Sequence, residues 1–347
     1  MNKNDAKMVQ GLSVLAMVCL HLFCRVNWAE LYATPVMLFG LPVSFYFGQI
    51  SDFCVFGFAL CSGYAHMTLY GKPHYYRGRL VSLLALYGRF WLILLLFTIA
   101  AAFVGKSWMY LDHPVAYLLT VTSVIPSYNG AWWYLPVYAV LVLASPLLMK
   151  WCRKYHWLLL SFFIAVFYVV GYYLRFKKAV SFSPYFSTES IGKFLMTLAE
   201  YLFGAVLYKL SFFEKAKAAA QKIKPALFWL GSAVLIAALM LVRAKFLRTL
   251  FVAPLTGMIL ITILVAGQKP KPVSDFFLFF GGHSTNIWLT HMFFIRVLFT
   301  DFVFIAKYPP LIFLFMLALC LALSYAINFL YHPLQKKILR LNDVAKV

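Results

Sequence analysis

The sequence predicts an all-α membrane protein, a polytopic helical bundle of about ten transmembrane helices with both termini in the cytoplasm. Hydrophobic residues make up 64% of its 347 residues and charged residues only 12%, whereas soluble domains carry about 25% charged residues. The hydrophobic residues also gather into runs long enough to cross a bilayer. Because the sequence shows no repeat of fixed period and no appended soluble segment, residues 1–347 are expected to form a single membrane domain.

The apolar runs give the expected spans in order along the chain. At a rise of 1.5 Å per residue, each run is long enough to cross roughly 30 Å of hydrocarbon. Residues 35–50 and 114–126 are also apolar but contain proline or glycine, so they are interfacial pieces, re-entrant pieces or additional spans. The expected spans cover residues 8–25, 52–70, 81–104, 131–149, 157–174, 191–209, 225–242, 249–267, 276–298 and 311–331.

The net charge of +21 follows the pattern of a membrane protein. Lysine and arginine occur in short groups between apolar runs and not in a basic tail or domain, which argues against nucleic-acid binding. With the N-terminus inside, about 19 of them fall on the cytoplasmic side and roughly 11 on the other. Arg175 and Arg243 are among those expected in outer loops. The basic stretch 211–224 is amphipathic, or a solvated loop near anionic headgroups.

The six cysteines lie almost entirely within apolar runs and form no CxxC pair. They are therefore expected to be small buried hydrophobic residues, with no disulfide framework and no thiolate metal site.

His21 is the first candidate for chemistry, because it lies inside the first apolar run and an imidazole in lipid is costly. In a helix, Gln10 lies eleven residues earlier on the same face, roughly 16 Å away. Arg25 lies one turn beyond His21 on that face. A histidine satisfied by a neighbouring helix is the structural alternative. The functional interpretation is a general base that deprotonates a hydroxyl nucleophile.

Three arginines follow the second run. Arg77 and Arg79 are placed at the cytoplasmic mouth, where they either anchor the orientation or hold phosphates by bidentate contacts. Arg89 lies inside the third span, where a guanidinium needs a partner or an aqueous cavity.

Later spans carry further polar or aromatic candidates. Trp132 and Trp133 begin a span, as an aromatic belt at the outer interface would. Asn286 and Ser284 are suited to bonding between helices, while His291 lies deep in its span. Zinc held by His21 and His291 is disfavoured, because no supporting carboxylate is evident and no metal is expected. Glu200, at membrane depth, is expected to orient a histidine or to pair with a buried arginine.

Taken in order, these motifs resemble the acyltransferase-3 family of integral membrane acyltransferases. The stretch QGLSVLAMVCLHLF is similar to the family's first-span motif, in which ten residues separate a basic residue from a histidine. GFALCSGY is similar to its FFxxSGY stretch and supplies Ser62. Arg77 and Arg79 stand where the family has a basic cluster. NGAWWYLPVY and GGHSTNIWLTHMFF resemble later motifs, so the resemblance runs over nearly the whole chain.

The resemblance implies an O-acyltransferase of the bacterial cell (plasma or inner) membrane. Acetyl-CoA, as acyl donor, would bind at the cytoplasmic mouth, and His21 would deprotonate the acceptor or relay the acyl group. The acceptor would be a hydroxyl of a surface polysaccharide or another cell-envelope glycan, free or lipid-linked. Direct transfer and a covalent acyl intermediate both remain open.

One position departs from the family pattern. Gln10 replaces the basic residue, and an amide donates a hydrogen bond but cannot pair with a phosphate charge. Donor binding would then depend on Lys7, Arg77 and Arg79, or the donor would differ, or activity would be reduced. The alternatives from other classes are a transporter or flippase of a lipid-linked or small solute, and a non-catalytic subunit. The absence of internal symmetry disfavours the transporter.

Overall fold

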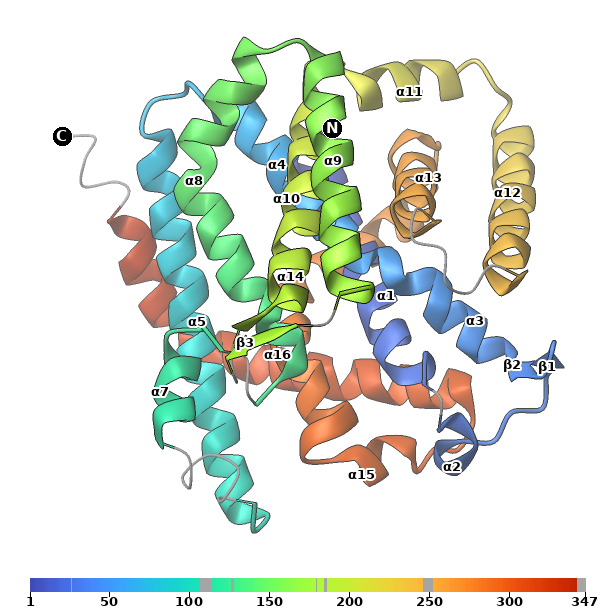
Figure 1. The fold of residues 1–347 in the computed structure, drawn as a ribbon. Coiled ribbons are helices and arrows are strands. Elements are labelled where there is room, and N and C mark those ends of the chain that lie inside the picture. The colour runs from blue at the N-terminus through green and yellow to red at the C-terminus, as the bar shows by residue number, and fades with distance from the viewer. Residues whose placement is uncertain are drawn as a thin grey trace. The chain divides into compact units, whose positions relative to one another are not determined.

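A computed structural model describes residues 1–25, 27–106, 114–125, 128–178, 180–183, 186–245 and 252–341 (Figure 1). Within these residues nearly all regular structure is helical, and the two β-sheets are short antiparallel pairs. The chain divides into two compact units, each assembled from separate stretches. Unit 1 comprises Met1–Trp28, Thr34–Tyr70 and Leu147–Ser284, and unit 2 comprises Ala29–Ala33, Gly71–Pro146 and Thr285–Val347.

Unit 1 consists mainly of helices. Its elements are α1 (Lys3–Phe23), β1 (Met37–Leu38), β2 (Leu41–Pro42), α3 (Val43–Ile50), the 3₁₀ turn η1 (Ser51–Phe53), α4 (Cys54–Leu69), α9 (Trp157–Phe176), β3 (Ser181–Ser183), β4 (Phe186–Ser187), α10 (Thr188–Lys209), α11 (Phe212–Ala220), α12 (Pro225–Lys245), α13 (Val252–Ala266) and most of α14 (Lys271–Met292).

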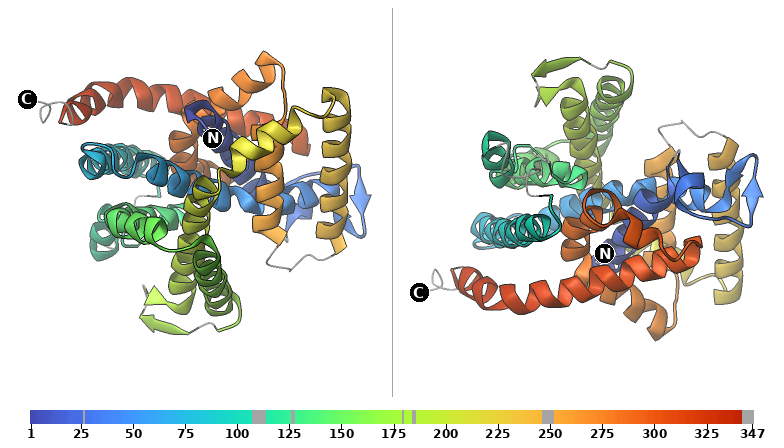
Figure 2. Two further views of the ribbon diagram at one scale, coloured as in Figure 1. Left: turned by 90° about the horizontal axis from the view of Figure 1, so that it is seen from above. Right: turned by 90° about the horizontal axis from the view of Figure 1, so that it is seen from below.

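Unit 2 is built around the long helices α5 and α16, which contact each other. The right view of Figure 2 draws α16 as one long continuous helix. The elements of the unit are most of α2 (Trp28–Leu31), α5 (Tyr75–Phe103), α7 (Pro114–Val121), the 3₁₀ turn η2 (Gly130–Trp133), most of α8 (Tyr134–Lys154), the π-helical turn η3 (Phe293–Val297), α15 (Thr300–Phe304) and α16 (Pro309–Arg340).

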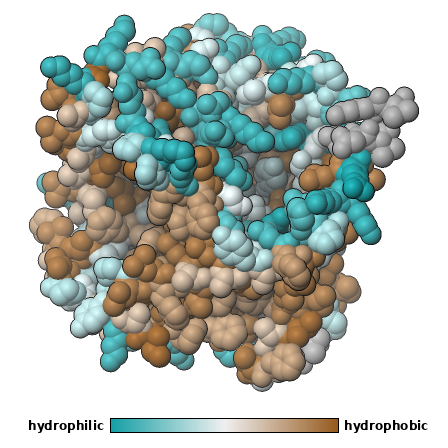
Figure 3. Space-filling view, turned by 180° about the vertical axis from the view of Figure 1, so that it is seen from behind, coloured by the Kyte–Doolittle hydropathy of each residue, from teal (hydrophilic) through white to brown (hydrophobic). Residues whose placement is uncertain are grey.

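Within the described residues, eight helices are long and apolar enough to cross a membrane. They are Lys3–Phe23, Val43–Leu69, Tyr75–Phe103, Gly130–Lys154, Trp157–Phe176, Thr188–Lys209, Pro225–Lys245 and Pro309–Arg340. The all-α, multi-pass class predicted from the sequence is therefore confirmed. Hydrophobic side chains are also widely exposed on the face drawn in Figure 3, as lipid contact requires.

The eight spans differ from the expected ten at two places, and both places still hold helices. Helix α13 has 15 described residues, which is short for a span. Helix α14 has 22 residues but includes Asp275, His283, Ser284 and Asn286, which lower its hydropathy.

The two proline- and glycine-containing segments form only short helices. Helices α3 and α7 have 8 residues each, too few to span a bilayer alone. The first continues through η1 into α4, so that Val43–Leu69 together form one candidate span. Within 211–224 the solvated-loop interpretation is wrong for Phe212–Ala220, which is helix α11 with Phe213 fully buried.

Glycines allow the helices of unit 1 to pack closely. A Cβ added to Gly63 on α4 would lie 1.7 Å from the Tyr201 carbonyl oxygen of α10, and one added to Gly204 would lie 2.2 Å from the Leu60 carbonyl oxygen. Helices α9 and α10 run side by side (Figures 1 and 2) and meet in the same way at Gly171 and Gly192. Small residues at these crossings are typical of helix packing in membranes.

Candidate active site

Helix α1 carries three of the predicted site residues. It begins with a capping box, in which the Asn2 side chain accepts from the Asp5 amide at 2.8 Å and the Asp5 carboxylate accepts from the Asn2 amide at 2.7 Å. It then continues without a break to Phe23. Lys7, Gln10 and His21 are all half-buried. The unbroken helix keeps Gln10 and His21 on one face, roughly 16 Å apart.

The C-terminal turns of α1 pack against α3 and η1. A Cβ added to Gly48 would lie 2.7 Å from the Cys24 amide nitrogen, so only glycine permits this approach. The Cys19 thiol also hydrogen-bonds the Ser51 side chain. Because His21 lies between Cys19 and Cys24, these contacts place its turn level with η1.

The N-terminal turns of α1 pack against α14. A Cβ on Gly11 would lie 2.0 Å from the Phe277 carbonyl oxygen, and one on Gly281 would lie 2.1 Å from the Lys7 carbonyl oxygen. The backbones therefore touch beside Lys7 and Gln10. This crossing fixes the predicted donor end of the α1 face.

The hydroxyl group of Ser62 donates its hydrogen bond within its own helix. Its Oγ donates to the Phe58 carbonyl oxygen of α4 at 2.8 Å. Such a bond to the preceding turn is the usual local solution for a serine within a helix.

Arg77 and Arg79 lie in the first turns of α5, in unit 2. Arg77 is exposed and donates to the Leu341 carbonyl oxygen, while Arg79 is half-buried.

Arg89 lies in the middle of α5 and is held by neutral groups. Its Nη1 donates to Asn286 Oδ1 at 2.7 Å and Asn328 Oδ1 at 2.9 Å, and its Nη2 donates to Gln335 Oε1 at 2.9 Å. The guanidinium also lies 5.0 Å from the centre of the Tyr331 ring. The expectation that Arg89 needs a partner is confirmed. We call Arg89, Asn286, Asn328 and Gln335 the Arg89 network.

The predicted interhelical role of Asn286 is confirmed, because its amide also donates to the Ser324 hydroxyl of α16 at 2.8 Å. Ser284 behaves differently and donates to the Gly281 carbonyl oxygen of its own helix at 2.9 Å.

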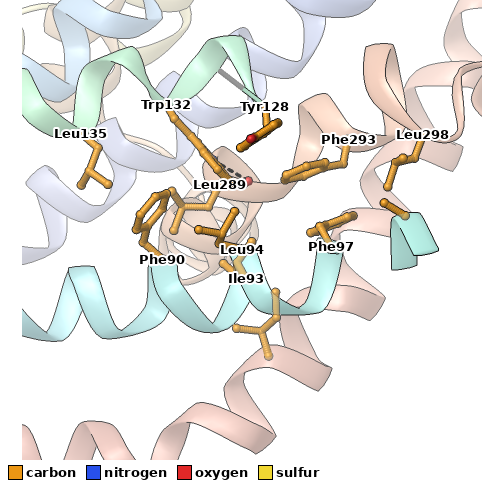
Figure 4. Packing of buried hydrophobic residues seen from close by; sticks show 12 residues of the cluster. Phe90, Ile93, Leu94, Phe97, Tyr128, Trp132, Leu135, Leu289, Phe293 and Leu298 are labelled. Atoms are coloured by element: carbon orange, nitrogen blue, oxygen red, sulfur yellow. Dashed lines mark hydrogen bonds between the residues drawn. The ribbon is translucent and has the colours of Figure 1, made fainter. Parts of the chain in front are cut away.

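Trp132 is a core residue, and the aromatic-belt interpretation is wrong for it. Its side chain is 1% exposed and its indole nitrogen donates to the Leu289 carbonyl oxygen at 2.9 Å. Figure 4 shows it packed with Phe90, Leu94 and Phe293. Trp133, the next residue, is half-buried.

His291 is fully buried one turn from Ile287. Its Nδ1 lies 3.1 Å from the Ile287 carbonyl oxygen and 2.9 Å from the Trp288 carbonyl oxygen. Because carbonyls only accept, Nδ1 carries the hydrogen. His291 belongs to unit 2 and His21 to unit 1. Within the described part of the chain, no three histidine, cysteine, aspartate or glutamate residues are arranged to hold a metal ion.

Glu200 belongs to a group of charged residues that the sequence did not predict to lie together. It interacts electrostatically with Arg175 of α9 and with Asp52 of η1, and Asp52 forms a salt bridge with Arg243 of α12. Tyr168 of α9 also interacts electrostatically with these carboxylates and arginines. Glu200 was expected to orient a histidine or to pair with a buried arginine, and the interaction described for it with an arginine is the electrostatic one with Arg175. We call Asp52, Tyr168, Arg175, Glu200 and Arg243 the charge cluster.

Two of these residues correct the sequence interpretation. Arg243 was expected in an outer loop, but it lies in the last turn of α12 with 5% of its surface exposed. Asp52 was not singled out at all. The signal available was an acid at the start of one apolar run and an arginine at the end of another, both on the predicted outer side.

The chain is thus a multi-pass helical membrane protein with buried polar side chains in both units. The profile of the acyltransferase-3 family, described as an acyltransferase domain, matches residues 5–329, and the chain belongs to that family. It is accordingly a membrane acyltransferase. No curated protein and no solved structure matches the chain.

Proposed function

We propose that the protein transfers an acetyl group from cytoplasmic acetyl-CoA to a hydroxyl of a cell-envelope glycan, with His21 as the catalytic base. The observation that carries the proposal is the position of His21. It is a half-buried imidazole in the last turn of a span, on the same helix face as Gln10, inside the segment matched by an acyltransferase family.

The direct reaction balances without any further reactant. The hydroxyl oxygen of the acceptor attacks the thioester carbonyl carbon while the imidazole of His21 takes the hydroxyl proton. The carbon–sulfur bond then breaks, and the departing thiolate of coenzyme A receives that proton. An ester and a free thiol result, and His21 returns to its starting state.

Lys7, Gln10, Arg77 and Arg79 are each proposed to contribute to donor binding. The cations supply charge for the donor phosphates, whereas Gln10 supplies only a hydrogen bond. Substitution of Arg77 or Arg79 by alanine is expected to raise the KM for acetyl-CoA. The accompanying change in the free energy of unfolding is expected to be small.

The decisive experiment measures ester-linked acetyl groups on purified surface glycans by mass spectrometry. Cells lacking the protein, cells with the wild type and cells with His21→Ala are compared at equal protein level. Loss of a general base lowers turnover by about 10²–10⁴-fold, so His21→Ala is expected to abolish the modification.

His332→Ala is the matched control, because His332 is exposed on α16. Full acetylation in the His21→Ala strain would overturn the proposal. The mass of the protein after incubation with acetyl-CoA alone separates direct transfer from a covalent acyl-enzyme.

A further inference from the structure

The charge cluster joins four elements of unit 1. Asp52 lies in η1, Tyr168 and Arg175 in α9, Glu200 in α10 and Arg243 in α12. All five belong to candidate membrane spans. Ionisable groups within spans are costly, and by default they mark a binding site or a pathway.

The local packing brings these elements together. Gly192 of α10 lies against Arg175, since an added Cβ would be 2.7 Å from the Arg175 Cβ. Helix α12 contacts α3 directly before η1. The salt bridge between Arg243 and Asp52 joins residues 191 positions apart in sequence.

The carboxylates in this cluster have unused hydrogen-bonding capacity. Glu200 is 9% exposed, and its Oε2 is buried without a hydrogen-bond partner. The Oδ1 atom of Asp52 is likewise buried without one. A buried carboxylate oxygen left unpaired costs free energy, which a ligand hydroxyl would recover.

The charges of the cluster cancel. In their ionised forms Asp52 and Glu200 contribute two negative charges, which balance the two positive charges of Arg175 and Arg243. A bound anion or cation would upset this balance, whereas a neutral polyol would not. Hydroxyl groups donate to carboxylates and accept from guanidinium groups, so a neutral polyol satisfies both kinds of residue.

The cluster lies at the same end of unit 1 as His21. Asp52 directly follows Ser51. The Ser51 side chain hydrogen-bonds Cys19, which lies two residues before His21 in α1. The Asp52 side chain is 27% exposed, while that of Arg243 is 6% exposed. Asp52 is therefore the more accessible member of the salt bridge.

From these observations we propose that the charge cluster binds the acceptor as an uncharged sugar residue, with the hydroxyls donating to Glu200 Oε2 and Asp52 Oδ1. This inference rests on the proposed function only in naming the bound sugar as acceptor. The alternative is a network that only stabilises the fold, and it makes a different prediction for the variants below.

The test is sugar binding to the purified full-length protein in a detergent without a sugar headgroup. The probes are methyl glycosides of glucose, galactose and N-acetylglucosamine, with methyl glucuronoside and glucose 1-phosphate as charged comparators. Binding is titrated by saturation-transfer NMR. The wild type is expected to bind at least one neutral glycoside more tightly than either charged probe.

Glu200→Gln and Asp52→Asn preserve side-chain size and are expected to weaken that binding by about tenfold each. Each variant leaves an arginine without its counter-charge, so the unfolding midpoints are expected to fall, and binding is therefore measured where each variant is folded. Their KM for acetyl-CoA is expected to stay near wild type. Asp275→Asn in α14 is the matched control, because Asp275 pairs with Lys271 on the surface of the same unit at 2.6 Å. If Glu200→Gln does not fold, Glu200→Gln/Arg175→Gln replaces it, since its charges still cancel.

The inference is overturned if no neutral glycoside binds the wild type, if the charged probes bind more tightly, or if both variants bind as the wild type does. These outcomes are separate from the His21 test. His21→Ala is expected to bind the probe normally while losing transfer, so failure of the proposed function leaves the binding result readable.

Discussion

The charge cluster of unit 1 and the Arg89 network of unit 2 keep guanidinium groups inside membrane spans in opposite ways. Arg243 forms a salt bridge with a carboxylate, and Arg175 interacts electrostatically with three carboxylates. Arg89 donates to three neutral amide oxygens. The first arrangement cancels charge, and the second spreads a positive charge over dipoles.

This difference determines how each region responds to the loss of one side chain. In the charge cluster, removing one ion leaves an opposite charge buried and unpaired. In the Arg89 network, the remaining amides can pair with one another, and Asn286 Nδ2 already donates to Asn328 Oδ1 at 3.0 Å. Charge cancellation thus suits a neutral ligand but makes the site more sensitive to substitution.

The largest expected effect is from Arg243→Met. It leaves Asp52 without its salt-bridge partner and is expected to lower the free energy of unfolding by about 3 kcal/mol. Reversible denaturation in mixed micelles measures the change. A loss no greater than that of the Arg89 variant below would contradict the comparison.

A second substitution sharpens this prediction. In Asp52→Leu/Arg243→Met both charges are removed together, so most of the lost stability is expected to return. Sugar binding should remain impaired, because Asp52 Oδ1 is gone. Recovery of both stability and binding would show that the pair only supports the fold.

Arg89→Met is expected to have a smaller effect. It breaks hydrogen bonds to Asn286, Asn328 and Gln335 but exposes no counter-charge, so the expected loss is about 1–2 kcal/mol. Arg89→Lys should lie between this variant and the wild type, since an ammonium group cannot match the fork of a guanidinium. The same denaturation measurement ranks the three proteins.

The smallest effect is expected from Asp275→Asn. Its ion pair with Lys271 spans one exposed helical turn, and solvent screens such pairs strongly. No measurable change in stability is expected. A loss comparable with that of Arg243→Met would mean that burial does not explain the contrast between the two kinds of pair.

The sequence predicted most of the spans and the shared face of Gln10 and His21. Both follow from local periodicity, because hydrophobic length and 3.6-residue spacing act within one helix. It did not predict the burial of Trp132, since an aromatic residue at a span end is equally typical of an interface. Whether it meets lipid headgroups or the Leu289 carbonyl depends on another segment.

What the sequence by itself determined is the class of protein, the positions of the helices and the face of α1 that carries His21. The tertiary structure alone decided which charges cancel. Asp52 and Arg243 are 191 residues apart, and no local pattern links an acid in one span to an arginine in another. Because ion pairing depends on distance in space, only the folded chain could bring Asp52, Arg175, Glu200 and Arg243 into one cluster.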